Sequence, residues 1–163
     1  GYKSAISIIR NAGLEHCIVI DGASWGQSID PIKKYAKDLI EHDPLHNLLF
    51  DIHMYGSWND KNKISKELKY TYDNKIPLIV GEFGYNANDG KNNLGCKVDA
   101  AHLLKICEQY KIGHLAWSWT GNNKENDWLD LLEDWQEYTD WGELVINSKN
   151  GIKKTSIKCK VFE

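Results

Sequence analysis

Short runs of apolar residues recur along the chain at intervals of about thirty residues, the length of a strand–helix–strand repeat. The runs cover residues 17–20, 48–55, 77–83 and 114–119. Each run is apolar almost throughout, which is typical of parallel strands that are covered on both faces. The pattern therefore predicts four strands.

Helical patterns fill the segments around these strands, over residues 2–11, 30–42, 63–74 and 98–110. Gly13 is placed to end the first helix, and Pro31 is placed to begin the second, where its missing N–H is not needed. Helices that alternate with strands predict βαβ units and a parallel sheet. Two architectures remain open at this point, a doubly wound sheet and part of a (βα)₈ barrel.

The loop after the first predicted strand, residues 21–26 (DGASWG), bears on the choice between these folds. A doubly wound nucleotide-binding fold places a glycine-rich phosphate loop at this point. The glycines of this loop match neither G-x-G-x-x-G nor a Walker sequence. The sequence therefore argues against a nucleotide cofactor.

Composition narrows the function classes. The chain has 163 residues, of which 42% are hydrophobic and 26% charged, and this excludes a disordered chain and suits one domain over residues 1–163. The net charge of −3 gives no basic surface for nucleic acid or an anionic membrane, and no apolar run approaches the ~20 residues of a membrane span. The four cysteines form no metal-binding pair and the histidines show no ligand spacing, so we predict no metal and no cofactor; disulfide formation stays open.

Polar and aromatic side chains gather where the predicted strands end. The positions are Asp21, Trp25, His53, Tyr55, Glu82, Trp117 and Trp119. In a (βα)₈ barrel the carboxyl ends of the strands carry the active site, and alternate residues of one strand share a face. A carboxylate among indoles suits a sugar, because indoles stack on sugar rings while carboxylates accept from the hydroxyls. The sequence thus predicts a carbohydrate cleft.

Structural roles compete with this interpretation for several tryptophans. We expect Trp119 to pack against its neighbours rather than to bind sugar. The tryptophans expected to anchor the core or loops are Trp58, Trp128, Trp135 and Trp141.

Three motifs lie at the carboxyl ends of the second, third and fourth predicted strands: IHMY (52–55), IVGEFG (79–84) and LAWSWTGN (115–122). Together with VIDG and WGQ within residues 19–27, and with further matches up to residue 142, they resemble the bacterial endo-β-1,4-mannanases of glycoside hydrolase family 5. One such motif would be weak evidence, but their order and spacing run through nearly the whole chain. The resemblance implies a (βα)₈ barrel that hydrolyses β-1,4-mannan with two glutamates and retains the anomeric configuration.

The resemblance also implies the roles of individual residues around the reacting bond. Glu82, at the end of the strand that matches family strand seven, corresponds to the nucleophile. His53 and Tyr55, on the strand that matches strand six, are expected to hydrogen-bond near Glu82 and to hold its orientation.

The same resemblance assigns the surrounding cleft. Trp117 is expected to stack on the sugar next to the cleavage point, with a cis bond between Trp117 and Ser118. Trp25 is expected to line the cleft further out, and Asn122 lies where the family shapes the rim. We therefore predict Trp117, Trp25 and Asn122, with His53 and Tyr55, as substrate-binding residues.

The resemblance covers only the last four βα units of the barrel. The first predicted strand matches family strand five, so the fold is predicted as a half-barrel with parallel strands and flanking helices. Family strand four ends in Asn-Glu, whose glutamate is the general acid/base, and no Asn-Glu-Pro occurs in this sequence. A retaining enzyme needs two carboxyls ~5–5.5 Å apart. We therefore expect this C-terminal half to be inactive alone.

A half-barrel leaves its outer strands with unpaired edges and its inner face open, so we expect it either to associate with another chain or to be molten. We expect Leu49, Leu78 and Val80 on that inner face. The predicted partners are β-mannan or a related polysaccharide and either a complementary N-terminal half or a second copy of the chain. The alternatives are a carbohydrate-binding module without catalysis and a self-associating half-barrel. The resemblance implies secretion, although this chain carries no signal peptide.

Asp51 departs from the family pattern. It shares the face of its strand with His53 and Tyr55, at a position where the family usually has a small neutral residue. A buried aspartate needs either a partner or a raised pKa.

Overall fold

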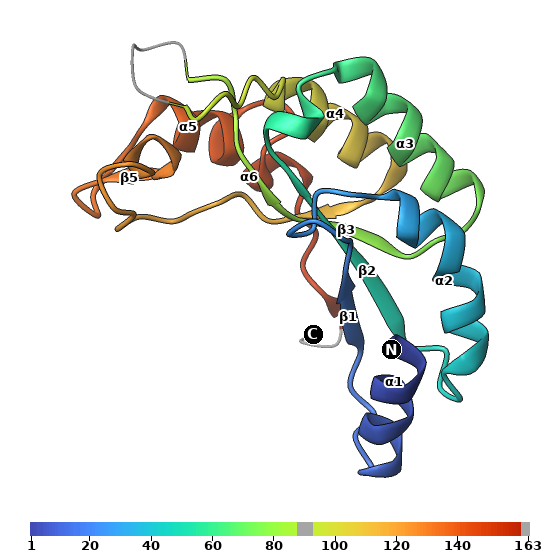
Figure 1. Cartoon of the computed structure of the whole chain (residues 1–163). Helices are drawn as coiled ribbons and strands as arrows, with labels where there is room; N and C mark the ends of the chain where they lie inside the picture. Colours follow the sequence, from blue (N-terminus) through green and yellow to red (C-terminus); the bar gives the residue numbers. More distant parts are fainter. Residues whose placement is uncertain (88–92, 161–163) are drawn as a thin grey trace.

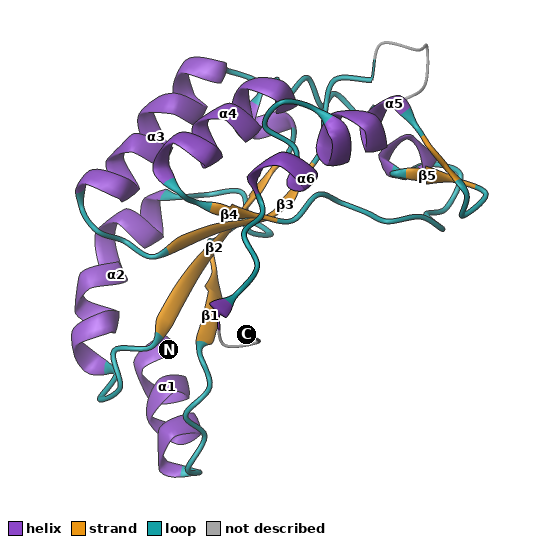
Figure 2. Ribbon diagram, turned by 180° about the vertical axis from the view of Figure 1, so that it is seen from behind, coloured by secondary structure: helices purple, strands orange, loops and turns teal. Residues whose placement is uncertain are grey.

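One parallel sheet of four strands organises the molecule, with strands in the order β1-β2-β3-β4. The computed structural model describes residues 1–87 and 93–160. The strands are β1 (Ile18–Asp21), β2 (Leu48–Met54), β3 (Leu78–Phe83) and β4 (Gly113–His114). The helices α1 (Tyr2–Asn11), α2 (Asp30–His42), α3 (Lys61–Asp73) and α4 (Ala100–Tyr110) lie in an arc along one side of this sheet (Figures 1 and 2).

This topology decides between the two architectures that the sequence left open. Strand order follows chain order, and the crossover helices lie on one side of the sheet. A doubly wound sheet reverses its strand order and carries helices on both faces. The arrangement is therefore the singly wound one of a barrel.

The helices agree closely with their predicted extents because their ends carry local signals. Pro31 occupies the first turn of α2. The Asp60 carboxylate accepts from the Asn62 N–H at the start of α3, and the Asp99 carboxylate accepts from the His102 N–H at the start of α4. Each cap satisfies a backbone donor that the helix itself leaves unpaired.

The strand predicted over residues 114–119 is wrong beyond His114. Strand β4 pairs with β3 only at Ile79↔Gly113 and Val80↔His114. Beyond His114 the backbone N–H groups of Leu115 and Trp117 still donate to the carbonyls of Val80 and Phe83, but the regular strand has ended. Short elements follow: a 3₁₀ turn (Asp127–Leu129), the antiparallel pair β5 (Leu132–Glu133) and β6 (Glu137–Tyr138), α5 (Asp140–Gly142), a π turn (Glu143–Asn147) and α6 (Ile152–Thr155). A further 3₁₀ turn (Gly56–Trp58) follows β2.

The two faces of the sheet differ in burial. The residues of β2 and β3 that face the helices are buried in the main core, whereas Val19 and Leu115 are exposed on the opposite face. Leu49 lies half-buried on that open face, as predicted. The prediction for Leu78 and Val80 is wrong, because both are buried in the core.

A β-bulge explains this error. Ile52 pairs with Val80 and His53 pairs with Glu82, so Gly81 is an extra residue in β3. Regular alternation would put Val80 on the same open face as Glu82. The bulge changes the phase of the alternation between them, so Val80 faces the helices instead.

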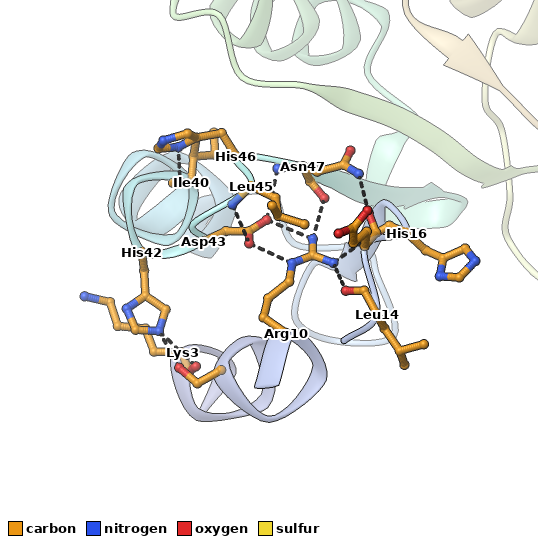
Figure 3. Close-up of polar contacts among 12 residues, drawn as sticks. Lys3, Arg10, Leu14, His16, Ile40, His42, Asp43, Leu45, His46 and Asn47 are labelled. Carbon is orange, nitrogen blue, oxygen red and sulfur yellow. Dashed lines mark hydrogen bonds and ion pairs between the residues drawn. The ribbon is translucent and has the colours of Figure 1, made fainter. Parts of the chain in front are cut away.

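A buried ion pair joins the ends of α1 and α2 (Figure 3). The Arg10 guanidinium donates from Nε and Nη2 to the two carboxylate oxygens of Asp43, at 2.8 and 2.9 Å. Arg10 also donates to the backbone carbonyls of Leu14, His16 and Asn47. The contacts tie the loop before β1 to the loop before β2, at the end of the sheet opposite Glu82.

The tryptophans separate into buried and exposed groups. Trp58 and Trp141 are fully buried and Trp128 is nearly so, which confirms their predicted anchoring role. The prediction for Trp135 is wrong: it is 71% exposed in the turn between β5 and β6, with a positive φ of 64°. Trp119 is also exposed rather than packed.

Two further findings concern the whole set of described residues. All four cysteines are free, two of them buried and two exposed. In the described part of the chain, no helix has both the length and the apolar character needed to cross a membrane.

Candidate active site

The carboxylate of Glu82 owes its direction to the bulge in β3. Leu78 and Val80 face the helices, and regular alternation would send Glu82 to the same side. The extra residue at Gly81 instead aligns Glu82 with His53 of β2. Glu82 therefore lies on the open face, at the carboxyl end of the sheet.

Two side chains of the β2 end face this carboxylate. The Tyr55 hydroxyl donates to Glu82 Oε2 at 3.0 Å. The ring of His53 has Nδ1 at 3.6 Å from the same Oε2 atom. The structure thus brings together the predicted nucleophile and the two residues predicted to orient it.

Electrostatics keep Tyr55 in its donor form. Burial of the phenol and the adjacent Glu82 carboxylate raise the pKa of Tyr55 far above its ordinary value. The hydroxyl therefore stays protonated at physiological pH, as its hydrogen bond to Glu82 requires.

Trp117 is held next to this group by the segment that follows β4. Its peptide bond to Ser118 is cis, as the resemblance implied. The indole Nε1–H donates to Asn122 Oδ1 at 3.2 Å, and the Asn122 amide nitrogen donates to Ser118 Oγ and to Asp130 Oδ1. The side-chain amide of Asn122 is thus already engaged by the protein, in holding the Trp117 indole.

Trp25 projects from a tight turn after β1. Ser24, Trp25 and Gly26 all have positive φ, and the turn is closed by an antiparallel bridge between Ala23 and Ser28. A Cβ at Gly26 would overlap the ring of His53, so only glycine allows this turn to lie against that ring. The indole of Trp25 is 89% exposed, and the strand that precedes it, β1, is two places away from β3, which carries Glu82.

A cavity of about 270 Å³ adjoins the carboxylate. Its walls are formed by Tyr55, Gly56, Glu82, Asn93, Leu94, Cys96, Trp117, Asn126, Trp128 and Leu129. An apolar cavity with a few polar groups is typical of a ligand site. Sequence reasoning missed Asn93, Cys96 and Asn126, because they lie in irregular loops where no periodic pattern marks a direction.

A second group of side chains lies next to the Glu82 site, on the neighbouring strands β1 and β2. Among the described residues, one set could hold a metal ion, since ligand atoms of Asp21, Asp51 and His53 lie within 4.8 Å of one another. His53 Nε2 lies 3.5 Å from Asp51 Oδ2, which is an ion-pair distance for a protonated ring. That no metal or cofactor is needed stays a prediction.

Comparison with known proteins decides the family. The model of the cellulase family, glycosyl hydrolase family 5, matches residues 1–123. The chain belongs to glycosyl hydrolase family 5. This membership confirms the resemblance that the strand-end motifs indicated.

Relatives of this family 5 chain are mannanases. A mannan endo-1,4-β-mannosidase of Salipaludibacillus agaradhaerens is 39% identical over 99% of this chain and 52% of its own length. One from Cellvibrio japonicus is 35% identical over 99% of this chain and 37% of its own length. The chain thus spans about half, or less, of the curated relatives that it matches first.

Solved structures agree with the sequences. The β-mannanase of Thermomonospora fusca superimposes with a TM-score of 0.89 at 32% identity, over 99% of this chain and 53% of the mannanase. The β-mannanase of Streptomyces thermolilacinus gives 0.89 at 33% identity, with the same coverage. The family 5 chain is therefore the predicted half of a (βα)₈ barrel, with four parallel strands and flanking helices.

Proposed function

We propose that this chain is the nucleophile-bearing half of a retaining β-mannanase and that Glu82 is the nucleophile. The observation that carries the proposal is the Tyr55 hydroxyl bonded to Glu82 Oε2 at 3.0 Å, at the carboxyl end of a family 5 sheet. That donor fixes one carboxylate oxygen and leaves the other to react. The mannanase relatives support β-1,4-mannan as the substrate class.

The reaction would follow the two steps of a retaining hydrolase. A Glu82 oxygen attacks C1 of a mannose unit and forms an ester, while the bond from C1 to the leaving sugar oxygen breaks. That oxygen takes a proton from an acid outside this chain. Water then gives its proton back to the same group and attacks C1, which frees the Glu82 carboxylate.

The other predicted residues would bind and orient the sugar. Trp117 offers an indole face beside Glu82, held by Asn122, so we place Asn122 behind the platform rather than against the sugar. His53 faces Glu82 from β2, and Trp25 extends the cleft past β1. A polymeric substrate of this kind also supports an extracellular location.

The missing acid defines the first test. The chain alone is expected to release no reducing sugar from mannan, because a retaining hydrolase needs both carboxyls. Mixing it with the first four βα units of a mannanase relative should restore hydrolysis, and light scattering should show a one-to-one complex. The exposed Val19 and Leu115 of the open face would be covered in that complex.

The same measurements can contradict the proposal. Hydrolysis by the chain alone would refute the need for an acid from outside it. A complex that binds mannohexaose without turnover would favour a binding module instead. A homodimer that excludes the added half would favour self-association.

Tyr55→Phe tests the orientation of the nucleophile in the restored barrel. The substitution removes only the donor to Glu82, and hydrogen bonds to charged groups contribute about 1.5–3 kcal/mol, so we expect kcat to fall roughly 10- to 100-fold. KM should change little, because the hydroxyl acts on Glu82 rather than on the sugar. Tyr72→Phe, on the exposed side of α3, is the matched control and should have full activity; equal kinetics of the two variants would contradict the assigned role.

A further inference from the structure

Asp51 is a carboxylate in the middle of the sheet, where apolar packing would be expected. It lies on β2 between two paired strands and is only 9% exposed. Burial raises its pKa, which means that the ionised form costs stability in the folded chain. Groups that lower stability in this way are expected at functional or strained sites.

The position of the carboxylate is defined by Gly81. Asp51 Oδ1 accepts a hydrogen bond from the Gly81 N–H at 2.6 Å. A Cβ at residue 81 would overlap the carboxylate, so the two groups lie directly against each other. Gly81 is the extra residue of the bulge, and it immediately precedes Glu82.

The Asp51 carboxylate also faces the imidazole ring of His53, which lies between Asp51 and Glu82. His53 Nε2 lies 3.5 Å from Asp51 Oδ2, and Nδ1 of the same ring lies 3.6 Å from Glu82 Oε2. Asp51 is therefore linked to Glu82 by two routes. One is the Gly81 backbone of β3, and the other is the His53 ring of β2.

We propose that Asp51 is a positioning residue for Glu82: by accepting the Gly81 N–H it holds the bulge that turns the Glu82 carboxylate onto the open face. The inference rests on the proposed role of Glu82 as nucleophile. It does not depend on the rest of the barrel, because Asp51, Gly81 and Glu82 all belong to the paired strands β2 and β3.

Three variants separate the hydrogen bond from the charge and from general stability. Asp51→Ala removes the acceptor. Asp51→Asn keeps an acceptor oxygen for the Gly81 N–H and removes the buried charge, so it should fold at least as stably as the parent chain. Asp38→Ala is the control, because Asp38 is an exposed aspartate of α2 that pairs with Lys3 and lies outside the sheet.

The first readout uses the chain alone and needs no catalysis. Amide hydrogen exchange should become at least tenfold faster at Gly81 in Asp51→Ala than in the parent, relative to the amides of Leu78 and Val80 on the same strand. Asp51→Asn and Asp38→Ala should leave that ratio within threefold. An unchanged Gly81 ratio in Asp51→Ala would overturn the proposal, and a loss of protection at all three amides alike would show a merely structural role.

The second readout follows Glu82 in the restored barrel, with 2,4-dinitrophenyl 2-deoxy-2-fluoro-β-mannobioside as the probe. A Glu82 oxygen forms the bond to C1 while dinitrophenolate leaves with the electron pair, so no proton donor is needed. Mass spectrometry should find the label on Glu82, formed at least tenfold more slowly in Asp51→Ala and within threefold of the parent rate in Asp51→Asn.

The outcomes distinguish this inference from the function on which it rests. Absence of label on Glu82 in the parent protein would count against the nucleophile itself, and the positioning role would fall with it. Labelling of the parent and Asp51→Ala at equal rates, or equal slowing in Asp51→Ala and Asp51→Asn, would overturn the Asp51 inference alone.

Discussion

Replacing Glu82 with alanine in the restored barrel is expected to abolish mannan hydrolysis, with kcat falling on the order of 10⁴-fold or more. The variant cannot form the ester at C1, and Tyr55 and His53 are left facing an empty position. Since the side chain is partly exposed and belongs to no core cluster, the fold should survive. Reducing-sugar release from mannan, with circular dichroism to verify folding, measures the effect.

Chemical rescue of Glu82→Ala by azide tests the nucleophile assignment more strictly than loss of activity does. In Glu82→Ala the azide ion can enter the vacated space and attack C1 of an activated β-mannoside, which displaces the leaving group and yields the α-mannosyl azide. Azide should not accelerate Glu41→Ala, the control on the exposed face of α2, which should keep full activity. Formation of the β-azide, or rescue that does not depend on Glu82, would refute the nucleophile assignment.

Local signals were sufficient to predict the helices and most of the sheet. Pro31 at the start of α2 and the aspartate caps of α3 and α4 act within one turn of the chain, so the sequence displays them directly. The alternation of apolar runs with helices predicted the parallel order of the strands. The end of β4 at His114 was not predictable, because the apolar residues that follow it continue the pattern after the regular strand has ended.

The bulge in β3 could not be predicted from the alternation of apolar and polar residues. Glu82 could be identified from its motif, but the face of Val80 could not, because one inserted residue reverses the phase of a strand. The structure also revealed what Asp51 bonds to. A hydrogen bond between residues 30 positions apart leaves no local trace in a sequence.

Exposure was the other feature that the sequence could not supply. Tryptophan is a large residue that is usually buried in the core, yet both Trp135 and Trp119 are exposed. Trp135 lies in the turn between β5 and β6, and Trp119 lies in the segment after β4. Asn122 was predicted at the rim as a substrate-binding residue; its side-chain oxygen accepts from the Trp117 indole, and its contact with substrate stays a prediction. Such roles depend on which loop packs against which, and that is decided by tertiary structure.

The largest expected effect on stability comes from Arg10→Ala. The Asp43 carboxylate is fully inaccessible and would lose its two charged hydrogen bonds while remaining buried. Removing one partner of a buried pair is strongly destabilising, and for a chain of this size the expected fall in Tm is roughly 10 °C. Arg10→Lys should fall between parent and alanine variant, because lysine keeps the charge but not the planar fork that reaches both oxygens (Figure 3).

The pH dependence identifies the ion pair as the cause. The Arg10 hydrogen bonds and the backbone N–H groups of Asn47 and Leu45 hold the pKa of Asp43 well below its usual range. Because folding lowers this pKa, the stabilisation is present above the ordinary aspartate pKa of ~3.9 and is lost as the pH falls from there. The parent should therefore lose Tm more steeply than Arg10→Ala below about pH 4.

Lys3→Ala is the matched control for the Arg10 series, since Lys3 pairs with Asp38 across the same two helices but in solvent. Exposed pairs contribute little to stability, so its Tm should stay within about 2 °C of the parent at every pH. If Arg10→Ala also stayed within that range, or if the two Tm curves remained parallel into acid, the Arg10–Asp43 pair would not be what holds the loops before β1 and β2 together. A steep, Arg10-dependent loss below pH 4 would instead show that this buried pair, at the end of the sheet opposite Glu82, contributes directly to the acid sensitivity of the chain.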